Sequence, residues 1–316
     1  MPLEVESLSL GNDDDDDEFD EKSSMEMDRE MEKEKEELLE HARNSTYTAP
    51  THRRPASGSF LKSLKSIISI HNETINIHTH LLGSILFFGL PIFLYTRLIT
   101  RYPTATTADV LVFSTFFLGV AICFALSAVY HTLSNHSKSI AAFGNQLDYL
   151  GVVILMWGST IPSVYYGFYC DERVRDGYWI MISLLSLACA TTTFHTKFRT
   201  PSLRPYRALM YSCLGLSASI FITHGLLLHG WETQRKRMSL DWMAVMAVMN
   251  LLGAGAYAFR VPEKWYPNRH DFIGSSHQIM HVAVVAAGLA HMVGLLRAVE
   301  HVHGAGFSCG VMGEGR

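Results

Sequence analysis

From residue 78 onward the chain alternates long apolar runs with short polar links. None of the seven runs contains Asp, Glu, Lys or Arg, and each is 17 to 21 residues long. A helix needs about 20 mostly apolar residues to cross a bilayer, and these runs lack the polar face of soluble-protein helices. The pattern predicts an all-α membrane protein, a seven-transmembrane helix bundle within residues 59–300. The predicted spans are 78–96, 110–130, 149–165, 178–194, 208–228, 242–259 and 278–296.

The residues ahead of these runs have a very different composition. Residues 1–40 carry 18 of the 30 Asp and Glu but only 4 of the 26 Lys and Arg. They offer too little apolar surface to offset the entropy of ordering the chain. We therefore expect residues 1–58 to form a disordered acidic tail and linker. The remainder of the chain has only a modest basic excess, which does not support binding to nucleic acid.

A short amphipathic segment precedes the first span. Its apolar side chains share one helical face, with lysines at 62 and 65 outside that face. This arrangement is typical of a short helix lying on the cytoplasmic leaflet, although a simple linker fits the segment nearly as well. The apolar residues are Phe60, Leu61, Leu64, Ile67 and Ile68.

The distribution of basic residues favours one orientation in the membrane. Seven crossings put the two ends of the chain on opposite sides. With a cytoplasmic N-terminus the inner segments from residue 53 onward carry twelve Lys and Arg and the outer segments carry nine, which favours this orientation. Residues 301–316 would then form a short extracytoplasmic tail. Both the plasma membrane and the endoplasmic reticulum fit such a protein.

The five cysteines show no C-x-x-C pair, which argues against a disulfide scaffold and against a thiolate zinc site. Cys123, Cys189 and Cys213 lie in apolar runs, where we expect small buried side chains. Cys170 and Cys309 would share the extracytoplasmic side and could pair there, but we expect two free thiols.

The candidate chemistry gathers at one membrane face. His277 and His281 lie one helical turn apart at the start of the seventh span, so their side chains project from one helical face. His131 follows the second span, with Ser127 one turn before it, and Asp148 precedes the third span. The second span returns to the side of the N-terminus, and the third and seventh spans leave from that side. All five side chains therefore lie at the same face.

These residue types predict a metal site. Imidazole is the most common zinc ligand, and three protein ligands plus a water are typical of a catalytic zinc site. We predict that His131, His277 and His281 bind Zn²⁺. Asp148 is the best-placed general base, and Ser127 could donate a hydrogen bond to a developing oxyanion or to the bound water.

Two features leave alternatives open. The soluble zinc-hydrolase helix H-E-x-x-H carries a Glu where this chain has Gln278, so a base must come from elsewhere. The histidine pair could also simply hydrogen-bond within the bundle. His303 follows the last span, and we expect it to be solvated.

Three motifs follow one another along the chain. They are Glu73-Thr74-x-Asn76-x-x-Thr79-His80, Ser127-x-x-x-His131 with Asp148 seventeen residues on, and Ser276-His277-Gln278-x-x-His281. Together they resemble the signatures of a known membrane-protein family. This is the progestin and adipoQ receptor family, which includes adiponectin receptors, osmotin-receptor-like fungal proteins and bacterial haemolysin III proteins. The resemblance covers about residues 60–300 and is closest to the fungal osmotin-receptor-like branch.

This resemblance implies a seven-helix fold with a cytoplasmic N-terminus and one zinc near the cytoplasmic leaflet. The residues matching His131, His277 and His281 would hold the zinc, and Asp148 would contact the zinc-bound water. Adiponectin receptors are linked to ceramide hydrolysis, which releases a fatty acid and a sphingoid base, and fungal relatives to lipid and zinc homeostasis. The tail and outer links match nothing, so no extracellular protein ligand is implied.

Two functional hypotheses follow. The first is a zinc-dependent, ceramidase-type amidohydrolase that acts within the membrane on ceramide-like lipids. The alternative is a non-enzymatic membrane receptor or sensor in which the zinc is structural. A transporter is disfavoured, because the spans lack the charged residues of an ion or proton relay.

Overall fold

The computed structural model describes residues 53–195, 204–266, 269–270, 272–304, 307 and 309. Most of the predicted acidic tail, residues 1–52, lies outside this part of the chain. Every regular element among the described residues is a helix, and none of them is a strand. Seven helices are long and apolar enough to cross a membrane. The predicted all-α, seven-transmembrane fold class is therefore confirmed.

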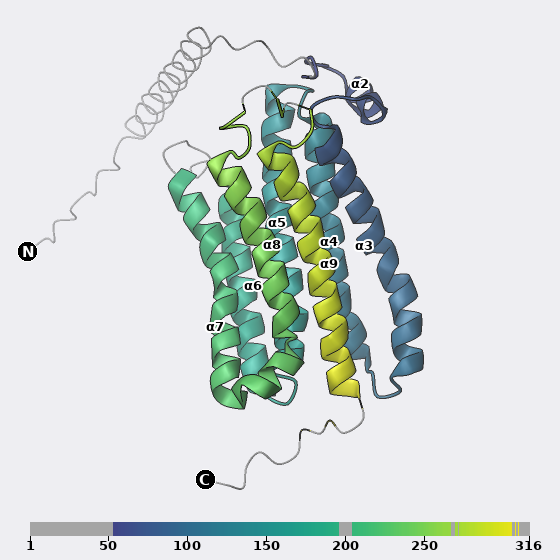
Figure 1. The fold of residues 1–316 in the computed structure, drawn as a ribbon, viewed down its shortest axis with the longest axis vertical. Coiled ribbons are helices and arrows are strands. Elements are labelled where there is room, and N and C mark those ends of the chain that lie inside the picture. The colour runs from purple at the N-terminus through teal and green to yellow at the C-terminus, as the bar shows by residue number, and fades with distance from the viewer. Residues whose placement is uncertain are drawn as a thin grey trace, which may run out of the picture. The chain divides into compact units, whose positions relative to one another are not determined.

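Each predicted apolar run lies within one long helix, and the helices extend into the polar links. The helices stand side by side along the long axis of the bundle (Figure 1). α4 lies against α3 and α5, and α9 packs against α8 and α3. The seven helices are α3 (Thr74–Arg101), α4 (Thr107–Leu133), α5 (Lys138–Gly167), α6 (Glu172–Phe194), α7 (Arg204–Arg237), α8 (Leu240–Phe259) and α9 (Ser276–His303).

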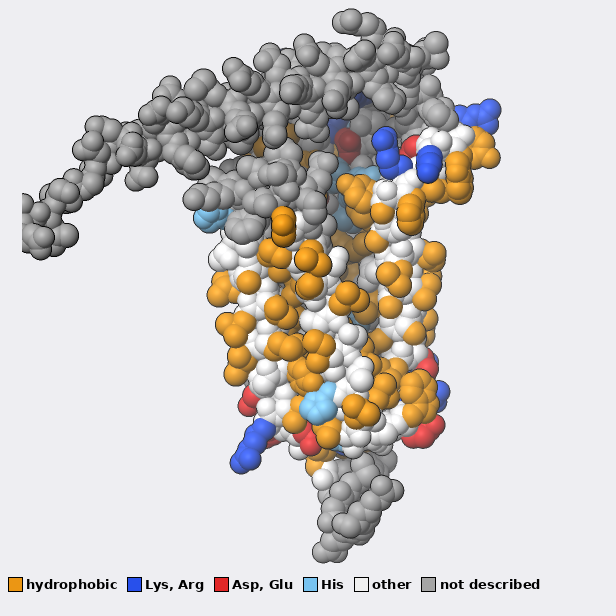
Figure 2. All heavy atoms as spheres, turned by 90° about the vertical axis from the view of Figure 1, so that its left-hand side faces the viewer, with side chains coloured by type: hydrophobic (Ala, Val, Ile, Leu, Met, Phe, Trp, Pro, Cys, Tyr) orange, Lys and Arg blue, Asp and Glu red, His pale blue; other side chains and the backbone are white. Residues whose placement is uncertain are grey.

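The outside of the bundle is apolar. Figure 2 shows hydrophobic side chains along its sides, with Lys, Arg, Asp and Glu gathered toward its ends. Large side chains such as Ile92, Leu184 and Leu251 are exposed over this surface. A soluble monomer rarely exposes so much contiguous apolar surface, whereas the hydrocarbon of a bilayer accommodates it. The surface therefore indicates an integral, multi-pass membrane protein.

Helix α4 forms the centre of the bundle. In its most apolar stretch 56% of the residues are buried, compared with 11% in α8. α5 approaches α4 closely, because a Cβ atom added to Gly158 would lie 2.4 Å from the carbonyl oxygen of Thr115. Small residues commonly permit such close packing of membrane helices. This contact fixes α4, which carries His131, relative to α5, which carries Asp148.

The amphipathic segment before the first span is helical, which decides against a simple linker. α2 (Phe60–Lys65) continues into a short 3₁₀ helix, η1 (Ser66–Ile68). The N–H of Ser57 donates to the carbonyl of Asn135 at 2.8 Å, and the hydroxyl of Ser63 donates to the Asn135 side chain at 2.9 Å. These bonds hold α2 against the α4–α5 link.

Two expectations for the opposite end of the bundle are wrong. Cys170 and Cys309 form a disulfide between the α5–α6 link and the segment after α9. His303 is not solvated, because α9 continues beyond the predicted span and carries its ring inward. Its Nε2 lies 2.8 Å from Oδ1 of the fully buried Asp109, which also accepts the Tyr166 hydroxyl at 2.9 Å. A buried carboxylate requires such partners.

Candidate metal centre

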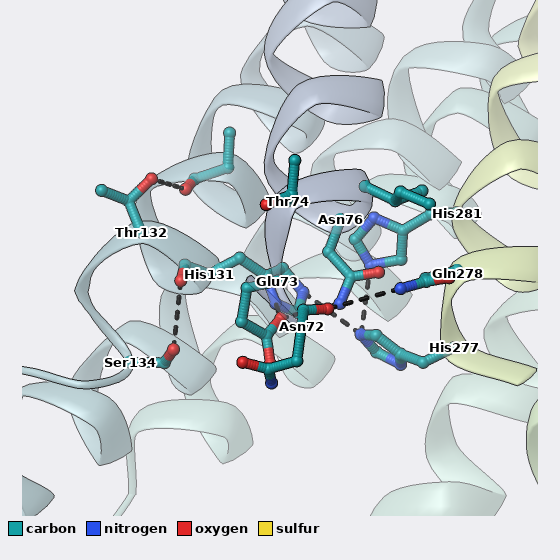
Figure 3. A network of polar contacts seen from close by, with 12 residues as sticks. Asn72, Glu73, Thr74, Asn76, His131, Thr132, Ser134, His277, Gln278 and His281 are labelled. Carbon is teal, nitrogen blue, oxygen red and sulfur yellow. Dashed lines mark hydrogen bonds and ion pairs between the residues drawn. The ribbon is translucent and has the colours of Figure 1, made fainter. Parts of the chain in front are cut away.

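Three histidine rings meet at the end of the bundle where α4 ends and α9 begins (Figure 3). Nε2 of His277 lies 3.2 Å from Nε2 of His131 and 3.1 Å from Nε2 of His281. One ring nitrogen from each residue lies within 4.8 Å of the other two. Tetrahedral ligands with bonds of about 2.0–2.1 Å lie about 3.3 Å apart. The three histidines could therefore hold a metal ion.

The start of α9 is fixed by a capping box formed by Ser275 and Gln278. Oε1 of Gln278 accepts the N–H of Gly274 at 2.7 Å. Its Nε2 donates to the carbonyl of Phe272 at 2.9 Å and to that of Asn72 at 3.3 Å. The residue that replaces the Glu of H-E-x-x-H is therefore used to cap the helix and to hold α9 beside the start of α3.

Glu73 orients the His131 ring. Its Oε2 accepts a hydrogen bond from Nδ1 of His131 at 2.8 Å and one from Asn76 at 2.7 Å, and its Oε1 accepts one from Asn72 at 2.9 Å. Burial alone would raise the pKa of Glu73, but the contacts with His131 and Asn76 lower it to about 2. A carboxylate that orients a metal-binding histidine is common in metal sites. Glu73 opens the first of the three sequence motifs, but the sequence gave it no role.

The N–H groups of the three rings cannot make good hydrogen bonds at all of the contacts between the rings. The arrangement therefore favours a bound cation over hydrogen bonding between the rings alone. Because Nδ1 of His131 donates to Glu73, its Nε2 carries a lone pair rather than a proton in the neutral ring. Nε2 of His277 faces both His131 and His281, and a single N–H cannot point at two rings at once. At most one of the two contacts is thus a good hydrogen bond, whereas one cation can bind all three lone pairs. The residues fit zinc.

Ser127 and Asp148 lie beside the histidines. Ser127 is one turn before His131 on α4 and is buried. Both Ser127 and His131 interact with the Asp148 carboxylate, Ser127 through its hydroxyl group and His131 electrostatically. The structure therefore places the Asp148 carboxylate within electrostatic range of His131, while its role as a base stays a prediction.

Two further residues support the site and were missed from the sequence. The Arg54 guanidinium donates to the carbonyl oxygens of His131 and Thr132. The ring of His80, from α3, stacks on that of His281 with centroids 3.8 Å apart. The position of His80 in the first motif could have pointed to a role at this site. No feature of the sequence pointed to Arg54, because it lies 77 residues before His131, whose main-chain carbonyl it contacts.

Glu263, in the α8–α9 link, stabilises the start of α9. Its Oε1 accepts hydrogen bonds from both the N–H and the hydroxyl of Ser276, each at 2.8 Å. Burial alone would raise the pKa of Glu263, but these bonds and the nearby Arg260 lower it below its usual value. A carboxylate also stabilises the N-terminus of a helix through the helix dipole.

Replacing Glu73 with Gln should weaken metal binding. The substitution keeps the shape of the side chain but removes the charge that orients His131, so we expect zinc affinity to fall about 10–100-fold. Competition with a chelator of known affinity measures this on the purified protein. Glu232→Gln, at an exposed carboxylate of α7, is the matched control and should bind zinc normally. Equal affinities for both variants would contradict this role of Glu73.

Glu263 should make stability depend on pH in the acid range. Its pKa in the folded protein lies below the unfolded value of about 4.3. Its stabilisation is therefore complete above that value and is lost as the pH falls through the folded pKa. We expect the Tm of the unmodified protein to fall more steeply than that of Glu263→Gln between about pH 5 and pH 3. Parallel curves in thermal unfolding at constant ionic strength would count against this assignment.

Comparison with known proteins agrees with the fold and with the motifs. The model of the haemolysin-III-related family matches residues 68–292. The adiponectin receptor protein of Drosophila melanogaster is 40% identical over 242 residues, which are 77% of this chain and 54% of that protein. The progestin and adipoQ receptor-like protein 1 of Caenorhabditis elegans is 38% identical over 242 residues, 77% of this chain and 55% of that protein.

The fungal relative is matched over more of its length. The ADIPOR-like receptor IZH2 of Saccharomyces cerevisiae is 35% identical over 267 residues, which are 84% of each chain. The chain thus spans about half the length of the two animal proteins and most of the yeast protein. The chain belongs to the haemolysin-III-related family, the progestin and adipoQ receptor family whose three motifs it carries.

Proposed function

We propose that this membrane protein is a zinc-dependent amidohydrolase that cleaves ceramide-like lipids into a fatty acid and a sphingoid base. The observation that carries the proposal is the convergence of three imidazoles, from His131, His277 and His281, on one point. Among the described residues this metal-binding group has three members, the number that leaves a fourth position open in catalytic zinc sites. Structural zinc sites are instead closed by four protein ligands.

The three histidines would hold the zinc, and the residues around them keep the rings in place. When bound there, zinc would supply a Lewis acid and a water acidified to near neutral pH. Glu73 holds the His131 ring through Nδ1, so that Nε2 faces the other two rings. His80 packs flat against His281 and limits the rotation of its ring.

We assign proton transfer to Asp148. Gln278 caps α9, and Glu73 accepts the hydrogen bond from His131. This leaves Asp148, a carboxyl group that interacts with Ser127 and His131. It would accept a proton from the attacking water and return it to the leaving nitrogen. The C–N bond of the amide breaks, the carbonyl carbon gains the water oxygen, and the nitrogen leaves as an amine. The apolar bundle suits the acyl chain of a lipid substrate.

Release of fatty acid from ceramide by the purified protein in mixed micelles tests this proposal. His281→Ala removes a zinc ligand and should reduce hydrolysis to background. Asp148→Asn should retain zinc but lower the rate about 100-fold or more. His301→Ala, at the far end of α9, is the control and should hydrolyse normally. Fatty-acid release that is equal in the unmodified protein and in His281→Ala would overturn the proposal.

A non-enzymatic receptor or sensor is the second candidate, because these three relatives are named as receptors or receptor-like proteins. In that case the zinc would only join the end of α4 to the start of α9. Metal removal would then lower the Tm, whereas Asp148→Asn would change neither zinc content nor stability. Hydrolysis absent from the unmodified, zinc-loaded protein would favour this candidate.

We also propose that the histidine end of the bundle faces the cytosol. The disulfide between Cys170 and Cys309 lies at the opposite end, and disulfides persist in oxidising compartments outside the cytosol. The plasma membrane and the endoplasmic reticulum both satisfy this condition. An epitope tag at the N-terminus should be stained only after selective permeabilisation of the plasma membrane. Staining of that tag in intact cells would reverse the orientation.

A further inference from the structure

A pocket of about 560 Å³ opens at the same end of the bundle as the histidines. It lies where the segment before α2, the α4–α5 link and the start of α3 meet. Three of its lining side chains are basic, namely Arg53, Arg54 and Lys138, and one is acidic, Glu73. Neutral polar residues also line it, and they include Asn72, Ser134, Asn135 and Ser137.

Among the described residues, ion pairs leave most of the positive charge of this basic pocket without an acidic partner. Arg53 and Lys138 are exposed, and neither has an ion-pair partner among the described residues. Arg54 donates to hydroxyl and main-chain carbonyl oxygens, which are neutral. The Glu73 carboxylate is already occupied by three hydrogen bonds, including one from His131. Within the described part of the chain, Arg53 and Lys138 therefore remain as basic groups suited to an anion with several oxygen atoms, such as a phosphate.

The neighbouring helix α2 indicates where such a phosphate would come from. The ring of Phe60 packs on that of His136, in the α4–α5 link, with centroids 4.1 Å apart. Leu61 and Leu64 are 62% and 52% exposed, and lysines at 62 and 65 flank them. Lys and Arg side chains gather beside hydrophobic ones at this end of the bundle (Figure 2). An exposed apolar face flanked by lysines suits the interfacial region of a membrane rather than water.

We propose that the basic pocket binds the phosphate group of an anionic membrane lipid, whose acyl chains lie in the leaflet beside the apolar face of α2. Arg53 and Lys138 contact the phosphate oxygens. Leu61 and Leu64 anchor α2 in the same leaflet. Since Glu73 lines the pocket and also holds His131, the bound lipid lies next to the supports of the metal centre. The proposal rests on the pocket and on α2, and does not require hydrolytic activity.

Thermal unfolding of the purified full chain in neutral detergent tests the proposal. The probes are dioctanoyl phosphatidic acid, dioctanoyl phosphatidylcholine and inorganic phosphate. We expect phosphatidic acid to raise the Tm in a saturable manner, and the other two probes to have little effect at the same concentrations. A response to inorganic phosphate as strong as that to phosphatidic acid would overturn the proposal, because the pocket would then be a site for a soluble anion.

Substitutions locate the binding in the molecule. Arg53→Gln combined with Lys138→Gln should raise the concentration of phosphatidic acid at half-saturation at least about tenfold. Arg173→Gln combined with Lys236→Gln removes the same charge from exposed positions at the other end of the bundle and should leave binding unchanged. Equal weakening by both pairs would indicate only a general charge effect and would overturn the assignment.

Two further measurements guard against a folding defect. The zinc content and the Tm of each variant without lipid report whether the bundle is intact, and Lys138→Gln alone provides a milder substitution if the double variant does not fold.

Leu61→Ser combined with Leu64→Ser should weaken binding of phosphatidic acid while sparing zinc binding. Undiminished binding of phosphatidic acid in that variant would contradict the part assigned to α2.

Discussion

The hydrocarbon interior of the bilayer excludes charged groups that lack partners, and this constraint places the chemistry of the protein at the two ends of its bundle. The apolar stretches of the spanning helices contain no Asp, Glu, Lys or Arg. At one end, Glu73 and three histidines form a connected layer. At the other end, Asp109 is buried with His303 and Tyr166. In both layers, contacts between helices satisfy a carboxylate that could not remain alone there.

The layer with the histidines is held together by residues that do not belong to the predicted ligand set. Glu73 links the start of α3 to the end of α4 through His131. Gln278 links the start of α9 to the same region of α3 through Asn72. Arg54 links the segment before α2 to the backbone of His131. Four chain segments are thus tied at one level, and a metal ion there would complete an arrangement that is already oriented.

An enzyme and a sensor would use the same arrangement of histidines, and they differ in one requirement. Both require three rings directed at one position, and both benefit from the orienting carboxylate of Glu73. They differ in the need for Asp148, because only hydrolysis requires a group that moves protons beside the rings. The lipid contact that we propose at the basic pocket is independent of this choice. Glu73 and Arg54 line this pocket and also contact His131. The pocket and the histidine rings are therefore close to each other.

The sequence determined the fold class and brought the main candidate residues to one face. A run of uncharged residues long enough to span the bilayer has few alternatives to a helix. Seven such runs then place the end of the second and the start of the seventh at the same membrane face. The positions of His131, His277 and His281 along the chain therefore predicted their convergence without any knowledge of side-chain packing.

Only the tertiary structure decided which partners these residues have. The direction of the Gln278 amide, the pairing of Glu73 with His131 and the reach of Arg54 depend on packing between segments far apart in the sequence. The disulfide between Cys170 and Cys309 and the burial of His303 differ from expectation for the same reason. Hydrophobic patterning specifies how many times the chain crosses the membrane and where. Contacts between polar side chains in the end layers depend instead on distances of a few ångströms, which local sequence does not encode.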